Sequence, residues 1–126
     1  MEQRVVPGKA TITHQDNNII IIKMLPLSEI HPIDAREIVK VASEMSGDKV
    51  HCILTDVSEM TFVGGDARAV FAEQEKSTIP AVAIVNRSKF RISFVNLYLK
   101  FTRPIIPTRA FESVETASEW LLEQMK

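Results

Sequence analysis

The sequence has little cysteine and no excess of charge of either sign, and each shortage excludes a class of protein. Cys52 is the single cysteine among 126 residues, so an internal disulfide is impossible and a reducing compartment is favoured. Lys and Arg number 15 against 16 Asp and Glu, which argues against a nucleic-acid partner. No apolar run approaches the roughly 20 residues that a membrane-spanning helix needs. We therefore expect a cytoplasmic protein that does not span a membrane.

The size and composition of the chain fit one compact unit. Its 126 residues are 45% hydrophobic, which is enough for a single core. There is no internal repeat, low-complexity tract or linker-like segment in the sequence. We expect residues 1–126 to form a single domain.

The first third of the chain predicts a β-hairpin followed by a helix. Residues 9–13 and 18–24 are apolar and β-branched, and the intervening 14–18 contains the Asp and Asn residues that favour turns. Pro32 suits the first turn of a helix, and Gly47 suits its end. The apolar residues between them recur at three- and four-residue spacing, as in an amphipathic helix: Ile38, Val41, Ala42 and Met45.

The middle of the chain predicts two buried strands on either side of a loop and a helix. Residues 50–55 and 81–85 are short, β-branched runs typical of buried parallel strands. Between them, a polar loop leads to a Gly-Gly pair, and residues 67–76 are rich in helix formers. We expect Val70 and Phe71, with Ala67, to face the core.

The last third predicts a helix, a short edge strand and a final helix. Residues 89–101 show both strand-like and helix-like apolar spacing, and their length favours a helix. Residues 109–111 suit a short edge strand, and Ser113 suits the start of the last helix. The resulting order β, β, α, β, α, β, α, β, α predicts an α/β layer fold whose parallel strands are joined by right-handed helical crossovers.

The central stretch resembles the STAS domain, the fold of bacterial anti-sigma-factor antagonists. In that family a strand ends in Asp-hydrophobic-Ser, continues through a short hydrophobic segment, and reaches Asp-Ser-Ser-Gly at the start of a helix. The first part is matched here by Asp56-Val57-Ser58-Glu59-Met60-Thr61-Phe62-Val63, and the second is replaced by Gly64-Gly65-Asp66-Ala67. Asp66 therefore stands where a partner kinase would phosphorylate serine.

The C-terminal half looks like a bacterial subgroup described as STAS-like or SpoIIAA-like. The residues that carry this likeness are Asn96, Tyr98, Leu99, Lys100, Phe101, Pro104, Pro107, Arg109, Phe111, Ala117, Trp120 and Leu121. The resemblance implies a mixed central sheet with helices packed on it, and a noncatalytic regulatory module that binds another protein without a cofactor. The implied interaction loop contains Asp56, Ser58, Thr61, Gly64, Gly65 and Asp66.

Three carboxylates around this loop raise an alternative. Asp56, Glu59 and Asp66 could perform acid/base chemistry if their environments separated their pKa values. The more common roles are a strand end for Asp56, a solvated side chain for Glu59 and a helix N-cap for Asp66. His14, His31 and His51 lack zinc-site spacing, and Cys52 sits in an apolar run. We therefore expect neither an enzyme nor a metal site.

The segment 89–101 carries more apolar residues than one face of a surface helix requires. Core packing is the common explanation. The alternative is a partner surface, a symmetric homodimer contact or a site for a small apolar or lipid-like ligand, by fold-level analogy with SEC14-type lipid carriers. The residues that would form such a surface are Phe90, Phe94, Leu97, Tyr98 and Phe101, flanked by several Lys and Arg residues.

Overall fold

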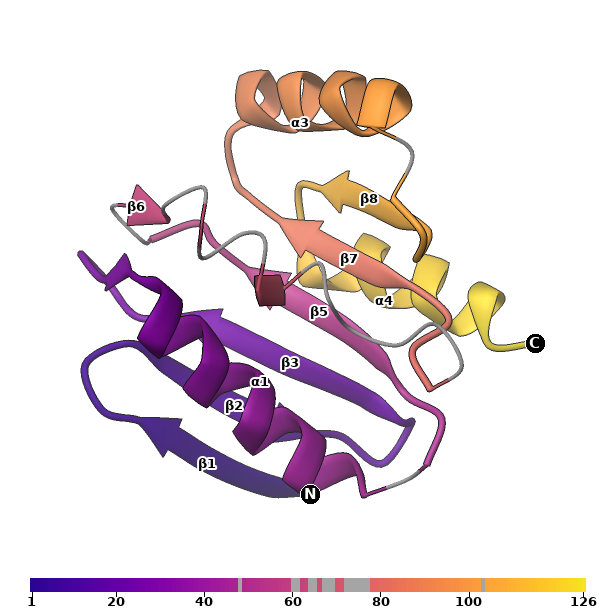
Figure 1. The fold of residues 1–126 in the computed structure, drawn as a ribbon. Helices are drawn as coiled ribbons and strands as arrows, with labels where there is room; N and C mark the ends of the chain where they lie inside the picture. Colours follow the sequence, from indigo (N-terminus) through magenta and orange to yellow (C-terminus); the bar gives the residue numbers. More distant parts are fainter. Residues whose placement is uncertain (48, 60–61, 64–65, 67–69, 72–77, 103) are drawn as a thin grey trace.

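A six-stranded mixed sheet forms the centre of the computed structural model (Figure 1). The model describes residues 1–47, 49–59, 62–63, 66, 70–71, 78–102 and 104–126. The strands, in spatial order, are β1 (Glu2–Val6), β2 (Ala10–His14), β3 (Ile19–Met24), β5 (Cys52–Asp56), β7 (Val82–Val85) and β8 (Thr108–Phe111). A second, two-stranded sheet pairs β4 (Glu29–Ile30) with β6 (Phe62–Val63).

The type of strand pairing changes once across the main sheet, at β3. β1, β2 and β3 pair antiparallel, whereas β3, β5, β7 and β8 run parallel. The predicted hairpin, the two buried strands and the edge strand are therefore confirmed, with bounds shifted by one or two residues. His14 belongs to β2 and not to the turn. β1, which the sequence did not predict, joins β2 through a turn in which Lys9 N–H donates to Val6 C=O at 3.0 Å.

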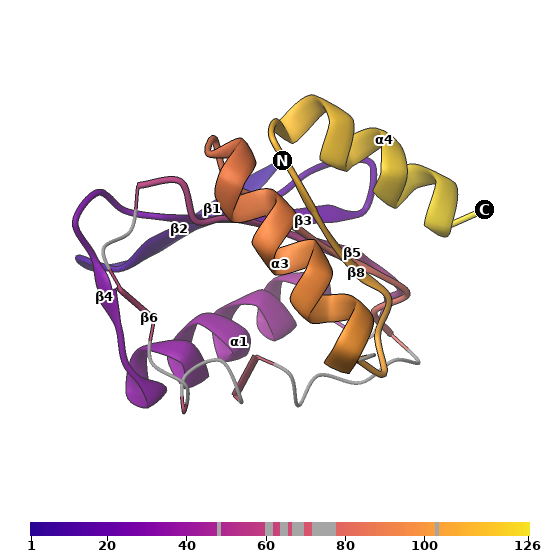
Figure 2. The ribbon, with the colours of Figure 1, turned by 90° about the horizontal axis from the view of Figure 1, so that it is seen from above.

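Helices cover the two faces of the sheet unequally. α1 (Pro32–Ser46) lies on one face and α4 (Val114–Gln124) on the other, as Figure 2 shows with the sheet seen close to edge-on. Under α1, the largest buried side chains include Ile12, Ile20, Ile22, Ile38 and Ile53. Under α4, a smaller cluster joins Ile19, Cys52, Leu54, Ala117 and Leu121. The alternation along β3 and β5 supplies both clusters, because neighbouring strand residues face opposite sides.

α1 begins and ends, and α4 begins, where the sequence predicts. α1 has Pro32 in its first turn, the Asp34 carboxylate accepts from His31 N–H at 2.9 Å, and the helix ends at Gly47, whose φ is +62°. Ser113 caps α4, since its hydroxyl accepts from Thr116 N–H at 3.2 Å.

α3 (Lys89–Thr102) confirms that the ambiguous segment is a helix. It lies beside β8 at the end of the sheet (Figure 1). The expectation that its apolar residues are mainly core is wrong for two of them, because Phe90 is 79% exposed and Leu97 is 54% exposed. The side chains of Phe94, Tyr98 and Phe101 lie outside the described part of the structure.

Most of the predicted helix 67–76 also lies outside the described residues. Val70 and Phe71 are described, and both are half-buried against the core cluster under α1, as predicted.

Candidate functional site

The carboxyl ends of four parallel strands meet on one side of the molecule. β3, β5, β7 and β8 run in the same direction, so the loops that follow them emerge together. In open α/β sheets, binding sites form outside these strand ends. The loop after β5 is the one that the sequence predicts as an interaction loop.

Two neighbouring strands end in the same local structure. The Asp56 Oδ1 atom accepts from Ser58 N–H at 3.0 Å, and the Asn86 Oδ1 atom accepts from Ser88 N–H at 3.0 Å. Each is a turn in which an Asp or Asn side chain replaces a backbone acceptor. The strands are adjacent, with Asp56 opposite Val85 in the register. These turns fix the direction in which the chain leaves each strand.

The second of these turns also starts α3. The Ser88 hydroxyl accepts from Arg91 N–H at 3.3 Å, and Ile92 N–H donates to the Ser88 carbonyl at 3.0 Å. The sequence analysis missed Asn86 as a site residue. Its signal was present, since Asn86-Arg87-Ser88 has the same Asx-x-Ser spacing as Asp56-Val57-Ser58.

Glu59 joins the loops after β3, β5 and β7. Leu27 N–H donates to the Glu59 carbonyl at 3.0 Å, and Arg87 Nη2 lies 4.0 Å from Glu59 Oε1. We call Leu27, Glu59 and Arg87 the Glu59 junction. The Arg87 side chain is 73% exposed, so this ion pair adds little to the stability of the fold, and the backbone hydrogen bond between Leu27 and Glu59 is the stronger link.

Large apolar side chains lie exposed within the Glu59 junction and close to it in sequence. Leu27 is 84% exposed and has a φ of +59°, a left-handed conformation that is uncommon for leucine. Phe90, three residues beyond Arg87, is 79% exposed. Exposed apolar residues with polar groups around them are typical of protein-binding surfaces.

Two serine hydroxyls on the same loops are buried without a hydrogen-bond partner in the described part of the chain. They are Ser28 Oγ, next to Leu27, and Ser58 Oγ, next to Glu59. Unsatisfied buried hydroxyls are rare in folded proteins and each calls for an explanation. They add unused hydrogen-bonding capacity to the loops that meet at the Glu59 junction.

The remaining residues of the predicted interaction loop are only partly placed. Asp66 is described and exposed. Thr61, Gly64 and Gly65 lie outside the described residues, as do the neighbours of Asp66 on both sides. The N-cap role of Asp66 therefore stays a prediction. Among the residues that the structure does describe, no three His, Cys, Asp or Glu side chains gather to form a metal site.

A cavity of about 510 Å³ lies between α3, β8 and α4. The Arg109 guanidinium there lies 5.2 Å from the centre of the Phe111 ring. The centres of the Phe111 and Trp120 rings are 5.5 Å apart. Phe90 and Leu97, which the sequence assigned to an apolar surface, are not among its walls. The residues that line it are Asn96, Leu99, Lys100, Pro104, Pro107, Thr108, Arg109 and Trp120.

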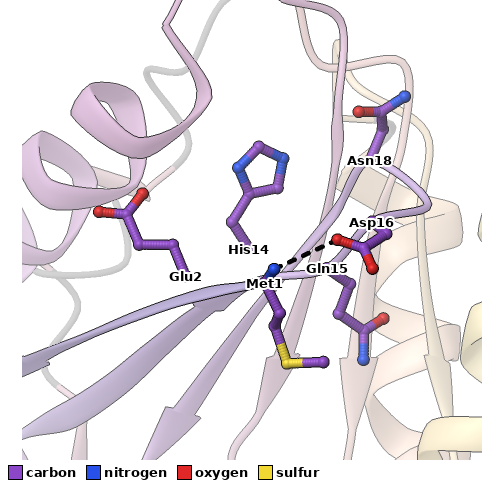
Figure 3. A pocket seen from close by; sticks show the side chains of 6 residues that line it. All are labelled: Met1, Glu2, His14, Gln15, Asp16 and Asn18. Carbon is purple, nitrogen blue, oxygen red and sulfur yellow. Dashed lines mark hydrogen bonds and ion pairs between the residues drawn. The ribbon is translucent and has the colours of Figure 1, made fainter.

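A second cavity, of about 340 Å³, lies where β1 begins and β2 ends (Figure 3). Its walls are mostly polar, and Met1 N contacts the Asp16 carboxylate at 3.3 Å across it. His14, which points into this region, bonds through Nδ1 with the Met45 carbonyl at 3.2 Å. His14 therefore links β2 to the end of α1, which is a structural role.

Cys52 is buried beneath α4, as predicted. Its thiol lies 3.9 Å from the Leu121 carbonyl and is fully inaccessible. Burial raises the pKa of the thiol, against a smaller opposing effect of a backbone hydrogen bond involving Ala81. A raised pKa keeps the sulfur protonated and poorly nucleophilic at neutral pH.

Within the described residues, none of the helices combines the length and apolarity required to cross a bilayer.

The fold is that of the SpoIIAA-like proteins. A crystal structure of an uncharacterised protein of the DUF3478 family from Shewanella loihica PV-4, described as having a SpoIIAA-like fold, superposes with a TM-score of 0.65 at 15% identity, covering 96% of this chain and 98% of that one. An anti-sigma factor antagonist from Mycobacterium paratuberculosis superposes with a TM-score of 0.55 at 16% identity, covering 94% and 98%. The predicted STAS-like fold with a mixed sheet is thus confirmed.

The family is defined more closely by sequence. Residues 13–125 match the family described as Domain of unknown function (DUF7793), and the chain belongs to it. No curated protein matches the chain.

Proposed function

We propose that the chain is a single, noncatalytic STAS-like regulatory domain that binds another protein in the cytoplasm. The binding surface comprises the loop from Asp56 to Asp66, together with Leu27 and Phe90. The observation that carries this proposal is the Glu59 junction, which brings three loops together, includes the exposed Leu27 and lies three residues before the exposed Phe90. The fold shared with an anti-sigma factor antagonist supports a protein partner.

The chemistry of this surface suits binding better than catalysis. Asp56 is occupied by the turn to Ser58 N–H, and Glu59 by the contacts of the Glu59 junction. An active site needs a nucleophile or base together with groups that stabilise charge in the transition state. The exposed Leu27 and Phe90 instead offer apolar anchors, which dominate the affinity of protein interfaces.

The proposed module works without the usual phosphoserine switch. Asp66 stands at the position of the phosphorylated serine in the STAS domains that the chain resembles. Aspartate cannot accept a phosphoryl group from a serine kinase. A carboxylate at the start of a helix supplies about one negative charge, compared with about two for phosphoserine. The surface would then be held permanently in one charge state.

Affinity capture from a lysate of the native host, with matched surface variants as bait, tests the proposal. Leu27→Asn removes the apolar side chain and tolerates the positive φ, and Phe90→Ser removes the ring. Ile105→Asn is the control, because Ile105 is 79% exposed and follows α3, before β8, away from the carboxyl ends.

We expect at least one protein to be retained by the wild type and by Ile105→Asn and to be lost with Leu27→Asn and Phe90→Ser. Unchanged melting temperatures would show that the variants are folded. Equal retention of every captured protein by all four baits would contradict the proposal.

A second candidate function is a carrier or sensor of a small amphipathic anion, and the cavity between α3, β8 and α4 favours it. Lys100 and Arg109 supply positive charge, whereas Leu99, Pro104 and Trp120 supply apolar walls. Among the residues that the structure describes, the walls of this cavity include no acidic side chain. A lipid-like carboxylate or phosphate ester has the matching chemistry.

Native mass spectrometry after gentle purification separates the two candidates. A carrier would show an added mass that is reduced in Arg109→Ala and retained in Arg91→Ala, an exposed arginine that does not line the cavity. A mass equal to that of the chain alone, in wild type and variants, would remove this second candidate.

A further inference from the structure

The main sheet has two edge strands, and at one of them a side chain of the fold occupies outward backbone groups. At β8, both outward groups of Ala110 are bonded to one side chain: Ala110 N–H donates to Asn96 Oδ1 at 2.8 Å, and Asn96 Nδ2 donates to the Ala110 carbonyl at 3.2 Å. Asn96 thus takes the place of a further strand. This closes the β8 edge to strand pairing.

At the other end of the sheet, the outward groups of β1 follow from the ladder between β2 and β3. Gln15 N–H donates to the Ile19 carbonyl, and Leu25 N–H donates to the Lys9 carbonyl. Hydrogen-bonded pairs alternate along an antiparallel ladder. The odd-numbered residues of β2 therefore point their backbone groups toward β3, and the even-numbered ones point theirs toward β1.

The residues of β1 that pair with these even-numbered residues are Glu2, Arg4 and Val6. Gln3 and Val5 must then direct their N–H and C=O groups away from the sheet. Figure 1 shows β1 at the outer border, and among the described residues no element lies along its free side. Two residues with open donors and acceptors form a template for another strand.

We propose that β1 pairs antiparallel with β1 of a second copy of this chain, with Gln3 at the two-fold axis. Gln3 and Val5 carry the open backbone groups, and pairing them with the same two residues of the partner allows three registers. Placing Gln3 opposite Val5 sets Arg4 against the partner's Arg4, which is unfavourable for like charges. Placing Val5 opposite Val5 sets Gln3 against the partner's Pro7, which has no N–H to donate.

The register with Gln3 opposite Gln3 avoids both problems. It sets Glu2 opposite the partner's Arg4, and Arg4 opposite the partner's Glu2, in pairs where side chains approach closely. It also sets Val5, 57% exposed, opposite the partner's Met1, 83% exposed. Charge complementarity and apolar contact therefore select the same register.

These contacts fall on the correct faces of the sheet. Arg4 Nη1 lies 3.5 Å from Glu44 Oε1 on α1, so Arg4 and Glu2 occupy the face that carries α1. Figure 3 shows Glu2 on that side and the Met1 side chain on the other. Opposite charges meet on one face of the joined sheet, and Met1 and Val5 meet on the opposite face.

The assembly is closed and does not need the protein partner of the proposed function. An isologous contact uses the same surface on both copies, and Asn96 on Ala110 disfavours extension into a filament at the β8 edge. The expected product is a dimer with one continuous sheet. This surface differs from the α3 contact that the sequence suggested for a homodimer.

Sedimentation analysis of the full chain over a range of concentrations tests the dimer. We expect a monomer–dimer equilibrium that Val5→Pro weakens about tenfold or more, because each copy loses one outward N–H donor. The ladder between β1 and β2 does not use this N–H group, so the melting temperature of the monomer should change little.

A charge-exchange experiment tests the register. Glu2→Arg makes both positions positive, and Arg4→Glu makes both negative, so each variant alone should be monomeric at concentrations where the wild type is dimeric. An equimolar mixture should form a heterodimer, since every facing pair then has opposite charges. A wild type that stays monomeric at high concentration overturns the proposal. Dimers that are unaffected by Val5→Pro and by both charge variants also overturn it.

Discussion

The side-chain amide of Asn96 pairs with both backbone groups of Ala110. The two hydrogen bonds, at 2.8 and 3.2 Å, repeat the pattern that a neighbouring strand would form. One residue therefore performs two tasks: it attaches α3 to β8, and it covers the outward backbone groups of Ala110 at this edge of the sheet. The geometry requires an amide, because the bonded groups are one donor and one acceptor.

Asn96→Ala should destabilise the fold by about 1–3 kcal/mol, since two hydrogen bonds are lost and two backbone groups of a half-buried strand are left unpaired. Urea unfolding followed by circular dichroism measures this change. Leu97→Ala is the matched control on the same helix, where a side chain 54% exposed should contribute much less.

Asn96→Asp refines the same prediction. The carboxylate can still accept from Ala110 N–H, but its second oxygen faces the Ala110 carbonyl and repels it. We expect a stability close to that of the alanine variant, recovering as the carboxyl group becomes protonated at low pH. If Asn96→Ala and Leu97→Ala lost equal stability, the amide pairing would have no special energetic role.

Much of the fold could be predicted from the sequence because its signals are local. The apolar spacing of α1, with Pro32 and Gly47 at its ends, specifies a helix without tertiary information. The Ser113 cap does the same for α4. β1 was missed because Glu2-Gln3-Arg4 shows no apolar alternation. It is a strand only because β2 lies beside it.

The candidate site was predicted less completely, for a physical reason. The turn formed by Asp56 and Ser58 depends on three consecutive residues, so its position can be predicted from the sequence. The contact between Leu27 and Glu59 joins loops that are far apart in sequence, so no local sequence pattern predicts it. The exposure of Phe90 likewise depends on where α3 lies relative to β8, which apolar spacing alone does not determine.

Cys52 gives a prediction about alkaline pH. Burial raises the pKa of its thiol above the ordinary value of 9.0, so the folded state favours the protonated form. This contribution to stability is fully present below the pKa of the unfolded chain and is lost as the pH rises toward the folded pKa. In that window the stability advantage of wild type over Cys52→Ala should shrink by at most about 1.4 kcal/mol per pH unit.

Guanidinium unfolding of wild type and Cys52→Ala between pH 7 and about 10.5 measures the difference. Groups common to both proteins cancel in this comparison. If the free energies of unfolding of the two proteins changed equally with pH across the whole range, burial would not be raising the pKa of the thiol. Reaction of the native protein with iodoacetamide should also be slow and limited by opening of the α4 side of the core.

Asp34 gives the corresponding prediction at acid pH. Partial burial acts to raise the pKa of its carboxyl group, but the hydrogen bond from His31 N–H and the nearby Lys9 ammonium outweigh it, and the pKa is lowered from 3.8. Lys9 Nζ lies 3.3 Å from Asp34 Oδ2. A lowered pKa contributes stability above the unfolded pKa, and this contribution is lost as the pH falls through the folded pKa.

Asp34→Asn should therefore cost about 0.5–1 kcal/mol at neutral pH, through loss of charge at a helix N-terminus and beside Lys9. The cost should vanish as the pH falls through the lowered pKa of the folded state, where the wild-type carboxyl group also becomes neutral. Asp16→Asn is the control, because the Asp16 side chain is 90% exposed. A cost for Asp34→Asn that did not depend on pH would assign the effect to hydrogen-bond geometry and not to charge.

Asp66→Ser separates two roles of the residue at which this chain departs from the STAS pattern. Serine caps a helix nearly as well as aspartate, so an ordinary cap, contributing about 1 kcal/mol, predicts little change in stability or binding. If the fixed negative charge matters to the partner, the melting temperature stays the same and the affinity for the captured protein changes. Asp66→Glu should then behave like the wild type in binding, because it keeps the charge although it caps less well.

Calorimetric titration of the partner recovered with wild-type bait measures both variants. Equal affinities for wild type, Asp66→Ser and Asp66→Glu would leave Asp66 with a capping role alone, and the proposed binding surface would then depend on Leu27, Phe90 and the Glu59 junction.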